Sequence, residues 1–230
     1  MPTPVQVVFA FQTQVASTLN LYDQLILAVA PSSQKTSLES MLSEQCVLAV
    51  AVQWEAFLHE LIVSYIEQSP AECVNYHKEK VKQAITKSKN AIFLSWINYN
   101  VPAVLTRKHI ENMVDPKGWN ITADSADSLA GLTDNLLMAS AAKKFSLPAV
   151  DRKFIDLIIA LRNYLSHRSG GSVTTLKDKL ADFQRTDKAS PLRGKLVDVG
   201  MFLKTVPKGS ADSRVKVIGM KLSTLAGKLI

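Results

Sequence analysis

The sequence has few cysteines, glycines and prolines: 230 residues include two Cys, nine Gly and nine Pro. The two cysteines, Cys46 and Cys73, lie inside helical patterns and give no disulfide framework, which favours a reducing compartment. A hydrophobic content of 47% argues against a disordered chain and indicates an ordered, helix-rich globule. A chain of this length can bury a sizeable core.

Several signatures of other protein classes are also missing. The apolar segment 5–30 has no Lys or Arg before Lys35, so it lacks the basic region of a signal peptide, and its glutamines argue against a membrane span. There is no phosphate-binding glycine loop, no nucleophile elbow, no internal repeat and no convincing alternating strand. We therefore expect a cytoplasmic all-α protein, an up-and-down helical bundle with a basic helical C-terminal extension and no membrane partner.

The net charge of +7 is concentrated at the C-terminal end. Residues 1–176 hold 15 Lys/Arg and 15 Asp/Glu, whereas residues 177–230 hold 12 Lys/Arg and five Asp. We predict a bundle domain over 1–175 and a basic extension over 176–230, packed on the bundle or flanking it. The excess charge suggests a polyanionic partner. A basic tail that only aids solubility is the alternative.

Local signals predict where several helices begin and end. Thr36 to Glu39 has the form of a capping box for a helix that reaches Gln68 and is almost wholly apolar between Cys46 and Val52. Ser69 followed by Pro70 predicts the cap and first position of the next helix. Further helices are predicted over 105–113, 125–145, 176–183, 192–206 and 215–229.

The residues best suited to catalysis lie at the C-terminal end of a predicted helix. This helix begins at Val150, and its apolar stripe ends at Leu165. Gly170 and Gly171 are expected to end this helix, as glycine does just past a C-terminus. Four polar residues of its last turns lie off the stripe: Arg162, Asn163, Ser166 and His167. Asn163 and His167 are four residues apart and share a face. An arginine, an amide and an imidazole therefore gather where a helix meets a loop.

These residues resemble the signature of the HEPN superfamily: an arginine, usually followed by a polar residue, and a histidine that four to six residues separate from the arginine. Here Asn163 follows Arg162, and four residues separate Arg162 from His167. The resemblance implies an all-helical, dimeric, metal-independent endoribonuclease that needs no cofactor. A subset of HEPN toxins carries a tyrosine two residues after the histidine, and this chain has Ser169 there. The tyrosine-targeting type of antitoxin is therefore not supported.

RNA cleavage without metal requires proton transfer at the 2′-hydroxyl and the leaving oxygen, and stabilisation of charge on the phosphate. An imidazole suits the first task, so we expect His167 to act as general acid or base. A guanidinium binds two phosphate oxygens, so Arg162 would stabilise the transition state and Asn163 would orient either group. The alternative for Arg162 and His167 is a surface pair favoured by the helix macrodipole.

The resemblance also implies a composite cleft in which two copies of the motif meet across a dimer axis. Arg168, Lys177 and Lys179 are predicted to contact the RNA backbone. Tyr164 would stack on a base or serve as an interface aromatic. Glu55, on the most apolar helix, would support the cleft or face solvent.

Other constellations are weaker. Cys73 and His77 share a helix face, but no second pair completes a metal site, so we expect no metal. The sequon at Asn120 is discounted because no secretory context accompanies it. Trp54, Trp96 and Trp119 are interpreted as core or interface residues. The expected function is a toxin or antiviral effector that cuts RNA, with an antitoxin or regulatory protein as a further partner. The alternative is a non-catalytic helical module that binds nucleic acid or protein.

Overall fold

The computed structural model describes residues 2–88, 91–118, 120–121 and 123–230. These residues form helices and loops without a strand, which confirms the all-α fold class. The α-helices are α1 (Pro4–Val29), α2 (Lys35–Gln68), α3 (Ala71–Lys87), α4 (Arg107–Val114), α5 (Ala126–Leu136), α6 (Ala139–Ala142), α7 (Ala149–His167), α8 (Gly170–Thr186), α9 (Val199–Lys204) and α10 (Arg214–Gly227). Two short 3-10 helices are η1 (Ala91–Trp96) and η2 (Lys143–Phe145).

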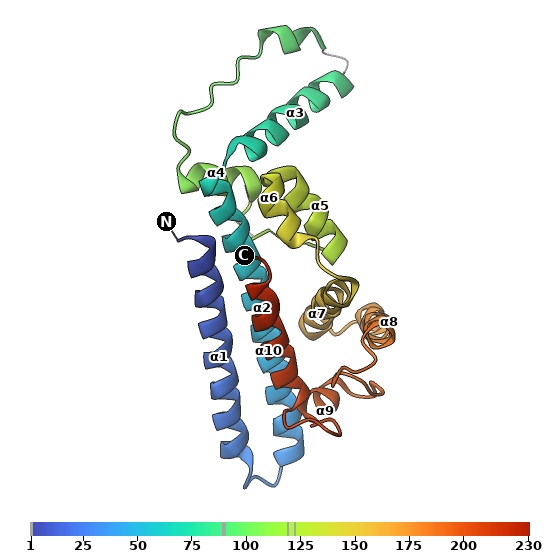
Figure 1. Cartoon of the computed structure of the whole chain (residues 1–230). Helices are drawn as coiled ribbons and strands as arrows, with labels where there is room; N and C mark the ends of the chain where they lie inside the picture. Colours follow the sequence, from blue (N-terminus) through green and yellow to red (C-terminus); the bar gives the residue numbers. More distant parts are fainter. Residues whose placement is uncertain (1, 89–90, 119, 122) are drawn as a thin grey trace.

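Helix α2 is the centre of the fold. It forms an antiparallel hairpin with α1, α10 runs beside both, and α4, α7 and α9 also pack on it (Figure 1). Helices α7 and α8 run across this layer, so the up-and-down arrangement is limited to the long helices. By length and composition α2 resembles a membrane span, but 61% of its apolar window is buried against other helices, as in a core helix.

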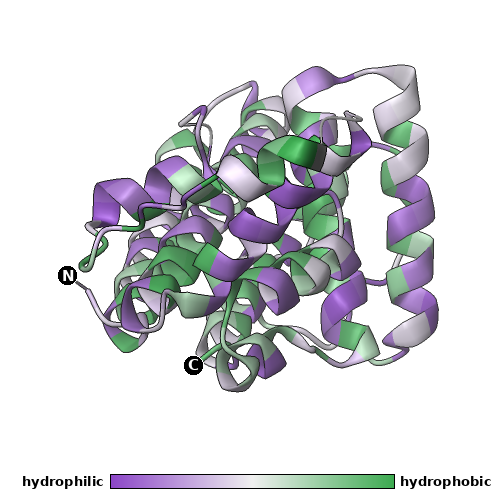
Figure 2. Cartoon of the chain, turned by 90° about the horizontal axis from the view of Figure 1, so that it is seen from above, coloured by the Kyte–Doolittle hydropathy of each residue, from purple (hydrophilic) through white to green (hydrophobic). Residues whose placement is uncertain are grey.

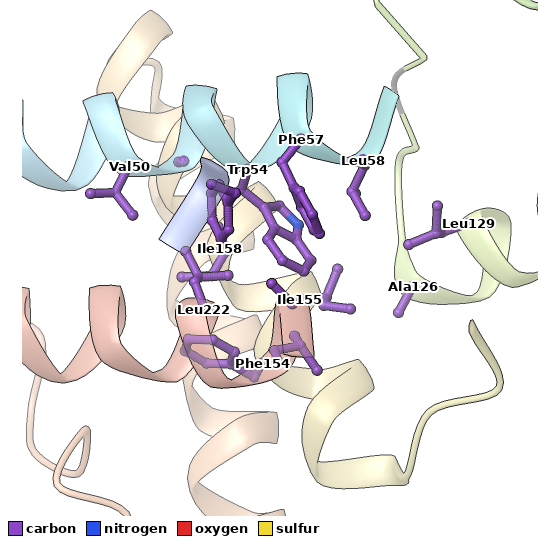
Figure 3. Packing of buried hydrophobic residues seen from close by; sticks show 14 of the residues in the cluster. Val50, Trp54, Phe57, Leu58, Ala126, Leu129, Phe154, Ile155, Ile158 and Leu222 are labelled. Atoms are coloured by element: carbon purple, nitrogen blue, oxygen red, sulfur yellow. The ribbon is translucent and has the colours of Figure 1, made fainter. Parts of the chain in front are cut away.

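The core is built around aromatic residues that α1 and α2 share. The rings of Phe11 and Phe57 stack with centroids 4.5 Å apart, and Trp54 meets Phe11 edge-on at 5.7 Å. Phe154 and Ile158 of α7 are part of the same packed cluster (Figure 3). Burial of each such side chain contributes roughly 1.5–3 kcal/mol, so this junction fixes α7 against the hairpin.

The basic C-terminal segment contributes to the same core. Leu222, Ala226 and Leu229 are fully buried, and Leu222 lies beside the α7 side chains in Figure 3. The Tyr65 hydroxyl donates to the Leu229 carbonyl oxygen at 2.7 Å, which ties the end of the chain to α2. Helix α8 runs through the boundary we placed between residues 175 and 176.

Several predicted helix ends differ in the structure. Helix α2 begins at Lys35 after an N-cap at Gln34 whose side chain makes no capping bond, so the capping box at Thr36 was wrong. Ser69 is the C-cap of α2, and α3 begins at Ala71 with Pro70 as its N-cap. The helix predicted over 125–145 is divided into α5, α6 and η2, because Leu137 adopts an extended backbone. Only 199–204 of the segment 192–206 is helical.

The helices are amphipathic to different degrees. Most of them carry both hydrophilic and hydrophobic residues (Figure 2). Helix α1 has a single charged residue, Asp23, and leaves Val5, Phe9 and Leu27 exposed on its outer side. Helix α3 and the segment after it project beyond the end of α2 (Figure 1).

Candidate functional site

Helix α7 places the motif by burying its opposite side. Phe154, Ile158 and Leu161 are at most 2% exposed and pack into the core, which fixes the rotation of the helix. Arg162 and Asn163 are then half-buried, and His167 is exposed at the last helical position. The apolar stripe read from the sequence therefore sets the direction of the polar residues.

Arg162 is held in place from two sides. Its Nη2 group donates to Glu55 Oε2 on α2 at 3.1 Å, and its Nη1 group donates to Asn163 Oδ1 at 3.0 Å. The Arg162 side chain is 31% exposed and that of Glu55 22%. Burial raises the pKa of the Glu55 carboxyl, and the Arg162 charge partly opposes this shift. Glu55 thus faces the motif helix and orients the guanidinium.

His167 lies on another side of the helix from Arg162. Five residues of α-helix separate Cα atoms by about 7.5 Å along the axis and by about 140° around it. Asn163 and His167, four residues apart, share a face instead. A single copy of α7 therefore presents its guanidinium toward α2 and its imidazole away from that contact, so the two groups do not converge on one small ligand.

Arg168 ends the motif helix in place of the expected glycines. It adopts the left-handed conformation with φ of 47° as the C-cap of α7. Its guanidinium donates to Glu44 Oε2 of α2 at 2.5 Å, which raises the pKa of Arg168. We infer that this ion pair offsets the cost of left-handed backbone at a non-glycine residue. Gly170 and Gly171 open α8, where Ser169 is the N-cap and accepts from the Ser172 N–H at 3.2 Å.

The remaining predicted RNA contacts differ in exposure. Tyr164 is half-buried against the core. Lys179 Nζ lies 3.3 Å from Asp156 Oδ2, so its charge is matched within the chain. Lys177, two residues earlier on α8 and therefore on the opposite side of the helix, is exposed. Lys177 and the half-exposed Arg168 side chain are the more accessible cations of this set.

All six carboxylates of the α1–α2 hairpin meet a Lys or Arg from a later element. The six pairs are Asp23–Lys216, Glu39–Lys204, Glu44–Arg168, Glu55–Arg162, Glu60–Arg107 and Glu67–Arg107. Lys228 likewise pairs with Asp151 of α7 at 2.6 Å. Part of the basic excess at the C-terminal end therefore neutralises the acidic hairpin, a use of charge that composition alone did not indicate.

The structure also places the cysteine and tryptophan residues considered in the sequence analysis. Cys73 is fully buried and burial raises the pKa of its thiol to about 11. No group of three metal-ligating side chains occurs in the described part of the chain. Trp54 is a core residue, Trp96 is 69% exposed, and Trp119 lies outside the described residues.

Comparisons with known proteins gave no match among family models, curated proteins or solved structures.

Proposed function

We propose that the protein is a metal-independent endoribonuclease of the HEPN type. The observation that carries the proposal is the arrangement at the end of α7, where Glu55 and Asn163 hold a partly exposed Arg162 and His167 is exposed at the last helical position. Oriented guanidinium groups stabilise charge that develops on a phosphate. In this proposal His167 transfers the proton, Asn163 orients Arg162, and Glu55 supports it.

The reaction is attack of the ribose 2′-oxygen on the adjacent phosphorus, with departure of the 5′-oxygen. The 2′-hydroxyl proton goes to a base, and the leaving 5′-oxygen receives a proton from an acid. The products are a 2′,3′-cyclic phosphate and a 5′-hydroxyl. Because Arg162 and His167 of one copy point to different sides, we propose a homodimer in which two copies of the motif share one cleft.

An apolar stripe on α2 supports this dimer. Met41, Leu48 and Val52 follow the spacing of one helix face, which also carries the exposed Gln45 and ends at Glu55; Met41 and Val52 are each 49% exposed. The stripe ends at the residue that holds Arg162, so a copy packed on it would bring a second motif close. Sedimentation of wild type and Val52→Glu tests this, since a charge placed in the interface should produce monomers.

The nuclease is tested with end-labelled single-stranded RNA in the presence of EDTA. Wild type should cut, and Arg162→Ala and His167→Ala should not. Arg152→Ala is the matched control, because Arg152 lies on the same helix and is ion-paired with Asp127 at 2.8 Å. A wild type that leaves RNA intact in all conditions would refute the proposal.

The second candidate is a non-catalytic helical module that binds nucleic acid or protein. It is favoured by one observation: the Arg162–Glu55 pair is one of six pairs that neutralise the hairpin, so Arg162 has a structural use. RNA binding that survives both motif substitutions, without cutting by wild type, would support this module. A role as a toxin or antiviral effector, with an antitoxin or regulatory partner, belongs to the first candidate.

A further inference from the structure

A cavity outside the motif lies between α3, which projects beyond α2, and α4, which packs on α2. We call residues 71–118 the arm; it contains α3, η1 and α4. The cavity, of about 340 Å³, lies between α3, the extended segment after Tyr99, and α4. Val74, Val81, Leu105 and Met113 give it apolar walls. Its volume is near the lower end of the range for ligand pockets.

One wall carries a polar atom without a partner. His77 Nε2 is buried and has no hydrogen bond within the described chain. Burial lowers the pKa of His77, so the ring is neutral at neutral pH and can accept or donate one hydrogen bond there. Buried polar groups are normally paired, so this nitrogen lacks its usual hydrogen bond; because it has almost no accessible surface, a ligand reaches it only when the ring turns toward the cavity. The side chains of Asn112 and His109 lie on the same cavity.

The arm is also basic. Residues 71–118 hold eight Lys/Arg and four Asp/Glu. Lys78 lines the cavity with its ammonium 5.8 Å from the centre of the Tyr99 ring. Lys82 lies one turn further on the same face of α3, where it is ion-paired with the exposed Glu79, so a phosphate would have to displace or share this carboxylate. Lys80 and Lys87 are spaced to share the other side of the helix. Positive charge therefore lies beside the open cavity.

We propose that the arm binds single-stranded RNA by taking one unstacked base into this cavity, while the adjacent phosphates lie along Lys78 and Lys82. Single-stranded RNA is recognised through splayed bases that contact apolar and aromatic surfaces and polar groups at the base edge. The cavity walls supply the apolar and aromatic surfaces, and His77 and Asn112 supply the polar groups for the base edge. The choice of RNA rests on the proposed function; the binding itself uses no residue of the motif.

The test is fluorescence anisotropy with a labelled 2′-O-methyl oligonucleotide, which lacks the attacking hydroxyl and stays intact. A second probe has the same backbone with abasic positions. Val81→Trp fills the cavity from a position that is 43% exposed, so folding should persist. It should weaken binding of the base-containing probe about tenfold and leave the abasic probe unchanged. His77→Phe, a second variant, should reduce discrimination between different bases.

Matched lysine variants separate this site from general attraction. Lys78→Gln with Lys82→Gln should weaken both probes and reduce the salt dependence, by up to about 1.4 units of slope for two charges on a single strand. Lys80→Gln with Lys87→Gln removes the same charge from the other side of α3 and should change little. Equal effects of the two pairs, or equal effects of Val81→Trp on the two probes, would overturn the proposal.

The outcome is distinguishable from that of the nuclease proposal. Wild type that does not bind the base-containing probe more tightly than the abasic one refutes the cavity site, whether or not it cuts RNA. Wild type that shows this preference but never cuts RNA refutes only the nuclease.

Discussion

Removing Arg162 should have two separable effects, one on stability and one on activity. Arg162→Ala leaves the Glu55 carboxylate, which is 22% exposed, without its cation. A hydrogen-bonded pair of this kind lies between an exposed ion pair and a buried one, so we expect a loss of about 1–2 kcal/mol at neutral pH. Chemical denaturation followed by circular dichroism measures it.

The stability lost in Arg162→Ala should depend on pH. Folding raises the pKa of Glu55 above its ordinary 4.5, so the folded state binds this proton more tightly than the unfolded state. Ionised Glu55 therefore lowers the free energy of unfolding at pH values above its folded-state pKa. Below its unfolded-state pKa the carboxyl is protonated in both states and this cost disappears. Without Arg162 the pKa rises further and the cost grows. The defect of Arg162→Ala should be largest at neutral pH, shrink as the pH falls through the raised folded-state pKa of Glu55, and be nearly absent below the ordinary value of 4.5.

The double variant separates the structural role from the catalytic one. Glu55→Gln removes the carboxylate, so Arg162→Ala with Glu55→Gln should regain stability relative to Arg162→Ala alone, with a coupling of about 1 kcal/mol. It should stay inactive on RNA, because the phosphate still lacks the guanidinium. Restored cutting in the double variant would refute a transition-state role for Arg162. Additive stabilities would refute the ion pair as a stabilising contact.

Three further predictions concern the fold. Gly200→Ala places a methyl group 2.7 Å from Ser40 Cβ and should cost about 1–3 kcal/mol, whereas Gly131→Ala, with nothing within 4 Å, should be neutral or slightly stabilising in the same denaturation assay. Leu222→Ala should cost about 2–5 kcal/mol in one cooperative transition, and a transition confined to part of the helical signal would contradict a shared core. Cys46, whose pKa burial raises to about 12, should resist thiol reagents until the protein is unfolded, so rapid labelling of native protein would contradict its burial.

The sequence predicted those features that depend on periodicity along one helix. The stripe from Val150 to Leu165 was sufficient to locate α7 and to place Arg162 and His167 off the core. The apolar composition of the second helix likewise indicated its central position. Periodicity reports which side of a helix is buried, and this is the information that positions the motif.

Features that depend on contacts distant in sequence were not predicted. From composition we predicted that the basic C-terminal residues bind a polyanionic partner. In the structure Lys204 and Lys216 instead pair with carboxylates of the α1–α2 hairpin. Arg168 takes the left-handed position expected of glycine, where Glu44, 124 residues away, receives its guanidinium. Neither partner can be identified from neighbouring residues. The cavity of the arm was missed because its walls come from three separate segments, α3, the extended segment after Tyr99 and α4.

The most direct test of the account is the chemistry of the RNA ends produced with EDTA present. Mass spectrometry of the products should show 2′,3′-cyclic phosphates and 5′-hydroxyls from wild type and from Arg152→Ala, and intact RNA from His167→Ala. Intact RNA from wild type, or identical fragments from His167→Ala, would contradict the assignment of this helix end as a nuclease site.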